Sequence, residues 1–364
     1  MSKSGDSLSK LALRKFKKNF WGVLSFWVIV SIGCLSLFAY IIAPDDSQNA
    51  NQMHLSIHSQ KPGFKVQMLF VPSESEQKQS FISDILFGKK HDELEIPISE
   101  HTIKNDTLFY TEFASDGLIG AEKFIALKDY ARTDSKPYVA EKAFLFGTDK
   151  YGRDLLSRVL VGSRISFSIG FIAVFISLVI GIFMGSVAGY FGGKIDALIM
   201  WVINVTWSIP TLLLVIAITL ALGKGFWQVF IAVGLTMWVE VARVVRGQIM
   251  SAKEMQYVTA AKALGFHHFR IITRHILPNI TAPIIVISAA NFAAAILIES
   301  GLSFLGIGAQ PPMASWGAMI KDHYNYIILG KPYLAIIPGL CIMILVMAFM
   351  LIGNALRDAL DVKS

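Results

Sequence analysis

Six stretches of apolar residues, each long enough to cross a lipid bilayer, limit what this chain can fold into. A transmembrane helix needs about 20 consecutive, mostly apolar residues. Six stretches reach that length: Phe20–Ala43, Ser163–Val187, Ile195–Leu222, Phe226–Val245, Thr281–Leu302 and Tyr333–Gly353. Only 16% of the residues are charged, against about a quarter in soluble proteins. We therefore predict an all-α integral membrane protein with six transmembrane helices.

The positive charge of the chain indicates its orientation in the membrane. The formal net charge is +7, and basic residues gather before the first apolar stretch and in or beside the segment 246–280. Lys and Arg concentrate in loops that face the cytoplasm. This pattern places the N-terminus, the segment 246–280 and the C-terminus in the cytoplasm, and it predicts a multi-pass protein of the cytoplasmic membrane. It fits a lipid membrane better than nucleic acid, since no basic patch interleaved with aromatic residues occurs.

The first apolar stretch could belong to a cleaved signal peptide or to a retained helix. Its apolar core is longer than the roughly 7–15 residues of a signal peptide, and no clear Ala-x-Ala cleavage site follows it. We predict that residues 1–43 form a basic cytoplasmic N-terminus and the first transmembrane helix. Cys34 and Cys341 lie in apolar stretches, and we expect both to be buried apolar filler rather than metal ligands or a disulfide.

Residues 44–146 differ from the rest because they are polar, mixed in charge and rich in turn residues. Short alternating runs at Phe64–Phe70 and Thr107–Tyr110 are typical of strands. A loop of about a hundred residues without structure would be unusual, so we predict a small β-containing extracytoplasmic insertion between the first and second transmembrane helices. Two roles remain open: a docking surface for a soluble partner, or an insertion that only stabilises the protein.

The polar segment 246–280 lies between two apolar stretches. It contains the run Tyr257–Gly265, with the small pair Ala260-Ala261, and later Pro278. The small pair suggests a short helix that a partner packs against closely, and Gly265 permits a tight exit because glycine accepts positive φ at a helix end. An interfacial amphipathic helix is the alternative. The chain has no phosphate-binding loop of the G-x-x-x-x-G-K-[ST] kind.

Several motifs occur in a fixed order after residue 146: Gly147-Thr148-Asp149-Lys150-Tyr151-Gly152-Arg153-Asp154, Ala188–Gly193, Glu299–Gly308, Gln310-Pro311-Pro312 with Ser315-Trp316-Gly317, and Gly353–Asp358. They resemble the C-type permease subunit of the dipeptide, oligopeptide and nickel class of ATP-binding-cassette (ABC) importers. The resemblance covers the first apolar stretch and about residues 147–361, and it does not cover the insertion. Residues 147–364 would then form a five-helix permease core with a cytoplasmic coupling loop at 246–280.

The resemblance implies a function and a set of partners. The chain would form half of a translocation pathway beside a B-type permease subunit, with two cytoplasmic ATPase subunits and an extracytoplasmic substrate-binding protein. It would be no enzyme and hold no cofactor, because the partner ATPases bind ATP and Mg. Coupling to them would involve Thr259, Ala260, Ala261, Leu264 and Gly265. Thr259 stands where the family usually has Glu, which leaves the effect of this difference open.

Other residues are candidates for the translocation pathway. They are Ser208, Pro210, Asn291 and Glu299. Pro210 should kink its helix, since proline removes a backbone donor, and Glu299 could contact the N-terminus of a peptide or only cap a neighbouring helix. Charged groups in a membrane need a partner, and we expect Glu240 to pair with Arg243 three residues later.

Two further sequence features are explained by packing and by polar contacts. Gly181, Gly185 and Gly189 predict close helix packing, either in a moving interface or in a static bundle. His267, His268 and His275 are expected to be polar interface residues rather than metal ligands, because no Cys or carboxylate cluster lies beside them.

Functions of other classes are also considered. A secondary transporter should show inverted repeats and ion-coupling carboxylates, and an intramembrane enzyme should show a catalytic constellation; the sequence displays neither. A secondary transporter, or a channel component without ATP coupling, remains the alternative. The substrate is left open among peptides, nickel chelates, opines and peptide antibiotics.

Overall fold

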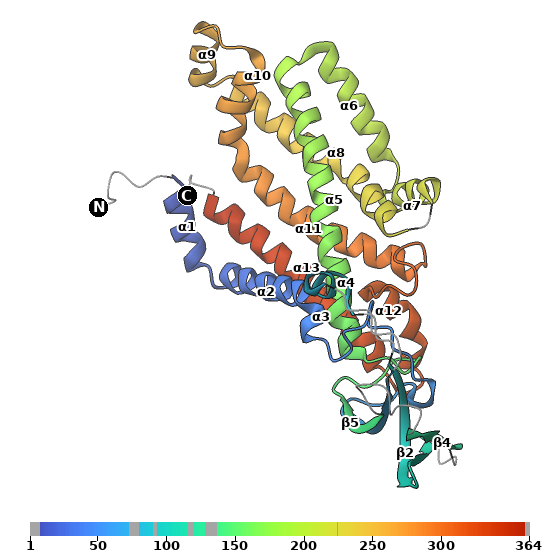
Figure 1. Cartoon of the computed structure of the whole chain (residues 1–364). Helices are drawn as coiled ribbons and strands as arrows, with labels where there is room; N and C mark the ends of the chain where they lie inside the picture. The colour runs from blue at the N-terminus through green and yellow to red at the C-terminus, as the bar shows by residue number, and fades with distance from the viewer. Residues whose placement is uncertain are drawn as a thin grey trace. The chain divides into compact units, whose positions relative to one another are not determined.

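The computed structural model describes residues 8–72, 80–89, 93–114, 120–127, 137–223 and 225–360 (Figure 1). The chain divides into two compact units. Unit 1 comprises Met1–Gly33, Ser166–Gln310 and Gly339–Ser364, and unit 2 comprises Cys34–Ile165 and Pro311–Pro338. The insertion predicted at 44–146 therefore belongs to a larger unit, which also contains the segment that follows it and residues 311–338.

Long helices dominate the chain. Those lying wholly or partly in unit 1 are α1 (Leu8–Lys18), α2 (Phe20–Leu37), α5 (Leu155–Phe191), α6 (Gly193–Ser208), α7 (Thr211–Leu222), α8 (Phe226–Lys253), α9 (Gln256–Ala263), α10 (His268–Arg270), η3 (Ile271–Ile276), η4 (Leu277–Ile280), α11 (Thr281–Phe304) and α13 (Tyr333–Leu360). The consecutive elements α10, η3, η4 and α11 form one helical stretch, His268–Phe304, of 37 residues.

The described helices include five stretches that are long and apolar enough to span a membrane, and a sixth if α6 and α7 count as one span. The sequence predicts one kinked span at Ile195–Leu222. The structure instead has two helices that meet at 93°. Ile209, which precedes the proline, is extended at ψ 128°, because the proline ring disfavours a helical conformation of its neighbour. The break is therefore a consequence of Pro210.

The glycine stripe of α5 packs against α8. A Cβ atom added at Gly181 would lie 2.5 Å from Val241 Cβ, and one at Gly185 would lie 2.5 Å from the carbonyl oxygen of Ala242. At Gly189 the nearest atom would be the carbonyl oxygen of Arg246, at 2.8 Å. The structure thus confirms the predicted close packing, since larger residues would force the two backbones apart.

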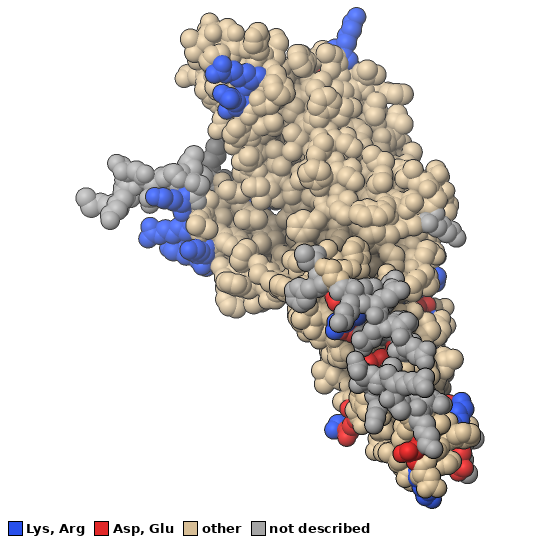
Figure 2. All heavy atoms as spheres, in the orientation of Figure 1, with Lys and Arg blue, Asp and Glu red and all other residues tan. Residues whose placement is uncertain are grey.

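The charges of unit 1 are unevenly placed. On the face shown in Figure 2, blue atoms lie near α9 and near α1, and a broad surface without charged residues lies beside both groups. Lys10, Arg14 and Lys18 of α1 are exposed, as are Lys262 and Arg270 at α9 and α10. An apolar belt with basic residues beyond it is typical of a protein that crosses a membrane.

Unit 2 is built on a five-stranded antiparallel sheet in the order β4-β3-β2-β1-β5. Its strands are β1 (Phe64–Val71), β2 (Leu94–Lys104), β3 (Thr107–Glu112), β4 (Glu122–Ala126) and β5 (Tyr138–Phe144). Its short helical segments are α3 (Ala39–Ile42), η1 (Leu55–Ile57), α4 (Phe81–Phe87), α12 (Trp316–His323) and η5 (Tyr324–Ile327). The two strands predicted from the alternating runs are confirmed as β1 and β3.

Strand β1, which lies between β2 and β5, has buried side chains on both faces of the sheet. Val66 and Met68 pack with Ile57 and Phe144, while Leu69 belongs to a second cluster that includes residues of β2 and β3. Successive side chains of a strand point to opposite faces, so the two clusters form separate small cores on the two sides. The apolar run of β1 is what allows so small a sheet to fold.

Candidate functional site

The segment between α8 and α11 has the tight helix end that its sequence predicts. Gly265 adopts φ +76° just after α9. Its N–H donates to the carbonyl oxygen of Lys262 at 2.9 Å, and the N–H of Phe266 donates to that of Ala261 at 3.2 Å. This pair of hydrogen bonds closes a helix end around a left-handed residue. The turn fixes the direction in which the chain leaves α9.

The α9 helix has one face toward the protein and one face toward solvent. Val258 and Ala261 are buried in a cluster with Val245 and Ile249 of α8 and with residues of η3. Thr259, Ala260 and Leu264 are exposed. The interpretation that both alanines face a partner is therefore wrong for Ala261, whose methyl group is 3% exposed. A helical spacing of three residues places Val258 and Ala261 on the same inward face.

Four large apolar side chains are exposed on this otherwise polar segment. Leu264 is 73% exposed and Phe269 is 79% exposed, with Met255 and Tyr257 also on the surface. We call these four residues the apolar docking patch. Exposed apolar patches rimmed by polar residues mark interaction sites. Phe269 and Met255 were missed in the sequence analysis, although a large apolar residue inside a basic loop is a signal that the sequence offers.

The segment is fastened to the adjacent spans at Tyr190, near the end of α5. The Tyr190 hydroxyl and Nδ1 of His268 lie 2.9 Å apart, and Lys253 Nζ donates to the carbonyl oxygen of Tyr190 at 3.5 Å. His275 stacks on Phe266 with ring centres 5.6 Å apart. In the part of the chain that the structure describes, no group of three or more His, Cys, Asp or Glu residues could hold a metal ion.

The four predicted pathway residues do not come together. The Ser208 hydroxyl donates to the carbonyl oxygen of Val205 at 2.7 Å, and Pro210 is exposed at the start of α7. Asn291 is 1% exposed, and its side-chain amide has no hydrogen-bond partner among the described residues. None of the three lines the pocket at the helix break described below.

Glu299 stabilises the end of its own helix rather than lining that pocket. It is 1% exposed, and its Oε1 accepts a hydrogen bond of 2.7 Å from the Ser303 hydroxyl. The same hydroxyl oxygen accepts one of 3.1 Å from the N–H of Ala309. These hydrogen bonds connect the turn after α11 to the end of that helix. Of the two roles considered for Glu299 in the sequence, this resembles helix capping more than contact with a peptide.

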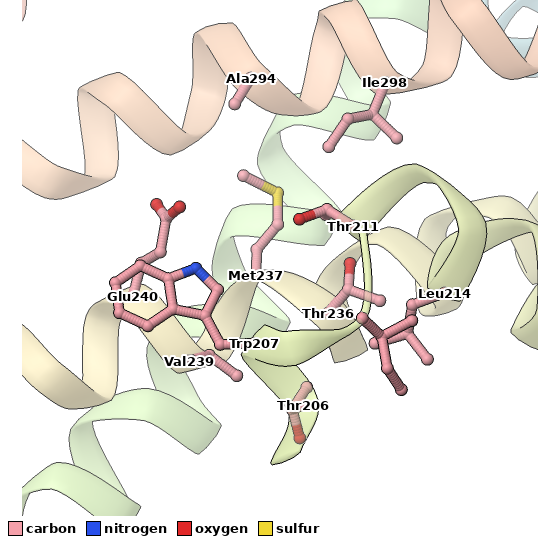
Figure 3. Close-up of a pocket in the computed structure, with 11 residues that line it drawn as sticks. Thr206, Trp207, Thr211, Leu214, Thr236, Met237, Val239, Glu240, Ala294 and Ile298 are labelled. Carbon is pink, nitrogen blue, oxygen red and sulfur yellow. The ribbon is translucent and has the colours of Figure 1, made fainter. Parts of the chain in front are cut away.

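A pocket of about 180 Å³ lies where α6 breaks from α7, against α8 and α11 (Figure 3). Its lining residues are Thr206, Trp207, Ile209, Thr211, Leu214, Thr236, Met237, Val239, Glu240, Ala294 and Ile298. In Figure 3 the indole of Trp207 and the carboxylate of Glu240 are drawn on one side, and Thr211 and Leu214 on the other. The sequence analysis missed this site, because only the 93° break places residues of four helices around one space.

The predicted pair between Glu240 and Arg243 is wrong. The Arg243 guanidinium carbon lies 3.5 Å from the ring centre of Trp207, and its Nη2 donates to Asn204 Oδ1 at 2.7 Å. A cation over an indole face is favourable, and the amide oxygen supplies an acceptor. Both partners belong to α6, so Arg243 links α8 to α6 and does not pair with Glu240.

The signature Gly147–Asp154 has a structural role within unit 2. Asp149 is fully buried and accepts hydrogen bonds from the N–H groups of Tyr151 at 2.8 Å and Arg153 at 3.0 Å. Arg153 Nη2 pairs with Asp149 Oδ2 at 2.6 Å, and Arg153 Nη1 donates to Asn51 Oδ1 at 2.9 Å. Buried charges of this kind are stable only when paired. The signature thereby joins the two ends of the insertion at the start of α5.

Two family models match the sequence. The model described as "Binding-protein-dependent transport system inner membrane component" matches residues 165–363. The model described as "N-terminal TM domain of oligopeptide transport permease C" matches residues 7–62.

Several named proteins are similar to the chain. The dipeptide transport system permease protein DppC of Bacillus subtilis is 43% identical over 218 residues, which are 60% of this chain and 68% of that protein. The protein of the same name from Lactococcus lactis subsp. cremoris is 31% identical and spans 100% of this chain and 96% of its own length. Among solved structures, the inward-facing MetNI methionine ABC transporter has a TM-score of 0.45 at 17% identity, covering 56% of this chain and 96% of the matched chain.

Proposed function

The chain belongs to the family of binding-protein-dependent transport system inner membrane components, and we propose that it forms half of the translocation pathway of an ATP-driven peptide importer. The family membership confirms the resemblance based on the signature residues. The chain is therefore a multi-pass membrane permease and not an enzyme. Peptides are the proposed substrate class because the dipeptide transport permeases of two organisms are similar to it.

One observation carries the proposed mechanism: the apolar docking patch is exposed on and beside α9, a helix whose inner face is packed against the membrane helices. Leu264 and Phe269 are the most exposed members of the patch. Burial of such side chains stabilises an interface by about 25 cal/mol per Å² of apolar surface. We infer that an ATPase subunit covers this patch.

Movement of the ATPase can reach the spans through the inner face of α9. Val258 and Ala261 share one buried cluster with Val241 and Val245 of α8, Tyr190 of α5, and residues of η3 and η4 that lead into α11. Close-packed clusters transmit displacement because they compress little. A shift of α9 would therefore tilt α5, α8 and α11 together and open the pathway on one side of the membrane.

The proposed assembly contains partners that this chain cannot replace. A B-type permease subunit would complete the pathway, and a substrate-binding protein would deliver the peptide from outside. Two ATPase subunits would bind ATP and Mg, since the chain itself has no phosphate-binding loop. Thr259 is exposed and, by the resemblance, stands where the family usually has Glu, so we propose that the contact with the ATPase rests more on the apolar patch than on an ion pair.

Reconstitution tests this function. The chain, its partner permease, the ATPases and the binding protein are placed in proteoliposomes, and uptake of a labelled dipeptide is measured with ATP and with a non-hydrolysable analogue. Accumulation that requires hydrolysis supports the proposal. Uptake driven by a proton or sodium gradient without ATP would instead support a secondary transporter, and passive equilibration would support a channel component.

A further inference from the structure

We propose that Glu240 binds the α-ammonium group of a peptide in transit, in the pocket at the break between α6 and α7. The inference rests on the proposed peptide-import function and assigns the substrate group that this pocket recognises. Every unblocked peptide carries this ammonium group, whatever its side chains. A site for it would let one permease carry many sequences.

The carboxylate of Glu240 lies within the apolar span predicted at Phe226–Val245, toward the end at Val245. It lies between Val239 and Val241 of α8, whose other core-facing residues are mainly apolar. Its side chain is exposed, and among the described residues it has no hydrogen bond or ion pair. A carboxylate is costly in lipid and usually faces a water-filled cavity or a charged partner. The position therefore fits a pathway surface better than a lipid-facing one.

The basic residue best placed to neutralise Glu240 is held elsewhere. Arg243 stacks on Trp207 and donates to Asn204. Among the described residues that line the pocket, Glu240 is the acidic one and none is Lys or Arg. A positive group that enters the pocket is therefore attracted by this carboxylate.

Two threonine hydroxyl oxygens in the pocket lining can accept hydrogen bonds, which suits an ammonium group. The Thr206 hydroxyl donates its hydrogen to the carbonyl oxygen of Val202 at 2.9 Å, and the Thr236 hydroxyl donates to that of Val233 at 2.8 Å. Each oxygen then keeps lone pairs for a donor from the ligand. An ammonium group has three donors and no acceptor.

The remaining lining favours an organic cation over a bare metal ion. Ile209, Leu214, Met237 and Ile298 supply apolar surface for a substrate side chain. The pocket has a volume of about 180 Å³, well above the roughly 10–15 Å³ that a cavity needs, by the same kind of measure, to hold one water molecule. That space holds the first residue of a peptide. An alkali ion would call for a smaller site with more oxygen ligands.

The test measures protection of the pocket by peptide in the complete importer. Leu214→Cys, in a background with Cys34→Ala and Cys341→Ala, places a reactive thiol in the lining. Its labelling by a neutral maleimide is timed with dialanine, with N-acetyl-dialanine and with sodium chloride. We expect dialanine to slow the labelling. The acetylated peptide should slow it only at about tenfold higher concentration or not at all. In Glu240→Gln, the concentration of dialanine that protects the thiol should rise about tenfold, because a charged hydrogen bond is lost.

Glu254→Gln is the matched control, because Glu254 is an exposed carboxylate at the end of the same helix and outside the pocket. It should leave protection unchanged. Equal protection by the free and acetylated peptides, unchanged protection in Glu240→Gln, or protection by sodium alone would overturn the inference. Failure of ATP-driven dipeptide uptake with unmodified protein would instead overturn the proposed function, so the two failures are distinguishable.

Discussion

Arg243 of α8 lies over the indole of Trp207 in α6, 3.5 Å from the ring centre, and not beside Glu240 on its own helix. Helical spacing would allow the pair with Glu240. The indole face and the Asn204 amide oxygen together hold the guanidinium instead. This relationship keeps a negative charge available at the pocket and joins α6 to α8 next to the helix break.

Removal of the indole should release Arg243 and reduce transport. In Trp207→Leu we expect Arg243 to pair with Glu240 and ATP-driven uptake of dialanine to fall about fivefold to tenfold, the effect of an interaction worth about 1–1.4 kcal/mol. The double variant Trp207→Leu with Arg243→Gln should recover part of the rate, because the competing cation is gone. A double variant no faster than Trp207→Leu alone would show that Arg243 does not compete for the carboxylate.

Arginine at two adjacent positions of α9 should impair different properties of the protein. Ala260 is exposed, so Ala260→Arg should leave the amount of folded protein normal while it lowers ATP-driven uptake by obstructing the ATPase. Ala261 is buried, so Ala261→Arg should lower the amount of folded protein, because an unpaired charge would enter an apolar cluster. Size-exclusion chromatography of the purified complex and uptake assays measure the two effects. Normal folding of both variants would contradict the burial of Ala261.

The turn at Gly265 should be sensitive to any side chain. At φ +76° a valine would cost about 1–2 kcal/mol, and we expect Gly265→Val to lower the peptide uptake per ATP hydrolysed while membrane insertion stays normal. Gly247→Ala on α8 is the control, because a Cβ there meets open space. Equal uptake per ATP in both variants would mean that the tight turn has no part in coupling.

The sequence specifies the elements of this protein better than their arrangement. Apolar length predicts the spans, and alternation predicts β1 and β3, because both signals are local. The break at Pro210 could be predicted as a kink, but its angle depends on how α7 packs on α8. The place of α9 could be predicted from its motif. The inward orientation of Ala261 could not, since it depends on the long-range cluster with Val245 and Ile249.

The candidate pathway residues show a second limit of the sequence. Glu240 and Glu299 are both single carboxylates in apolar helices, so composition alone cannot rank them. The structure separates them, because Glu299 is engaged by Ser303 whereas Glu240 lines a pocket. Which carboxylate a hydroxyl reaches depends on a turn that folds back onto the helix, and this cannot be read from spacing along the chain.

The sheet of unit 2 should lose stability in acid through Glu95. Burial alone would raise the pKa of this carboxyl group, but the His54 imidazole, whose Nε2 lies 3.2 Å from Oε2, and the nearby Lys142 ammonium group outweigh burial and hold the pKa below its ordinary value of 4.5. The Nζ atom of Lys142 lies 2.7 Å from Glu95 Oε2. A lowered pKa means that the ionised form stabilises the folded state above the ordinary pKa, and that this contribution is lost as the pH falls through the lower folded value.

Hydrogen exchange of β1, β2 and β5 in the intact protein measures this effect. Glu95→Gln should exchange faster than the unmodified protein at pH 7, and the difference should shrink below about pH 4. Glu141→Gln is the control, because its pair with Lys65 is more than half exposed on both sides and such pairs contribute little. A difference between Glu95→Gln and unmodified protein that stays constant down to pH 3 would contradict the assignment.

The contact between the apolar docking patch and an ATPase subunit is the central claim, and cross-linking tests it most directly. Leu264→Cys, with Cys34→Ala and Cys341→Ala, is treated with a short photoreactive maleimide in the complete importer, and the attached subunit is identified by mass spectrometry. Phe124→Cys is the control, because Phe124 is 68% exposed on the sheet of unit 2. We predict that Leu264→Cys links to the ATPase and Phe124→Cys does not. Efficient labelling of Leu264→Cys without any link to the ATPase would contradict the account.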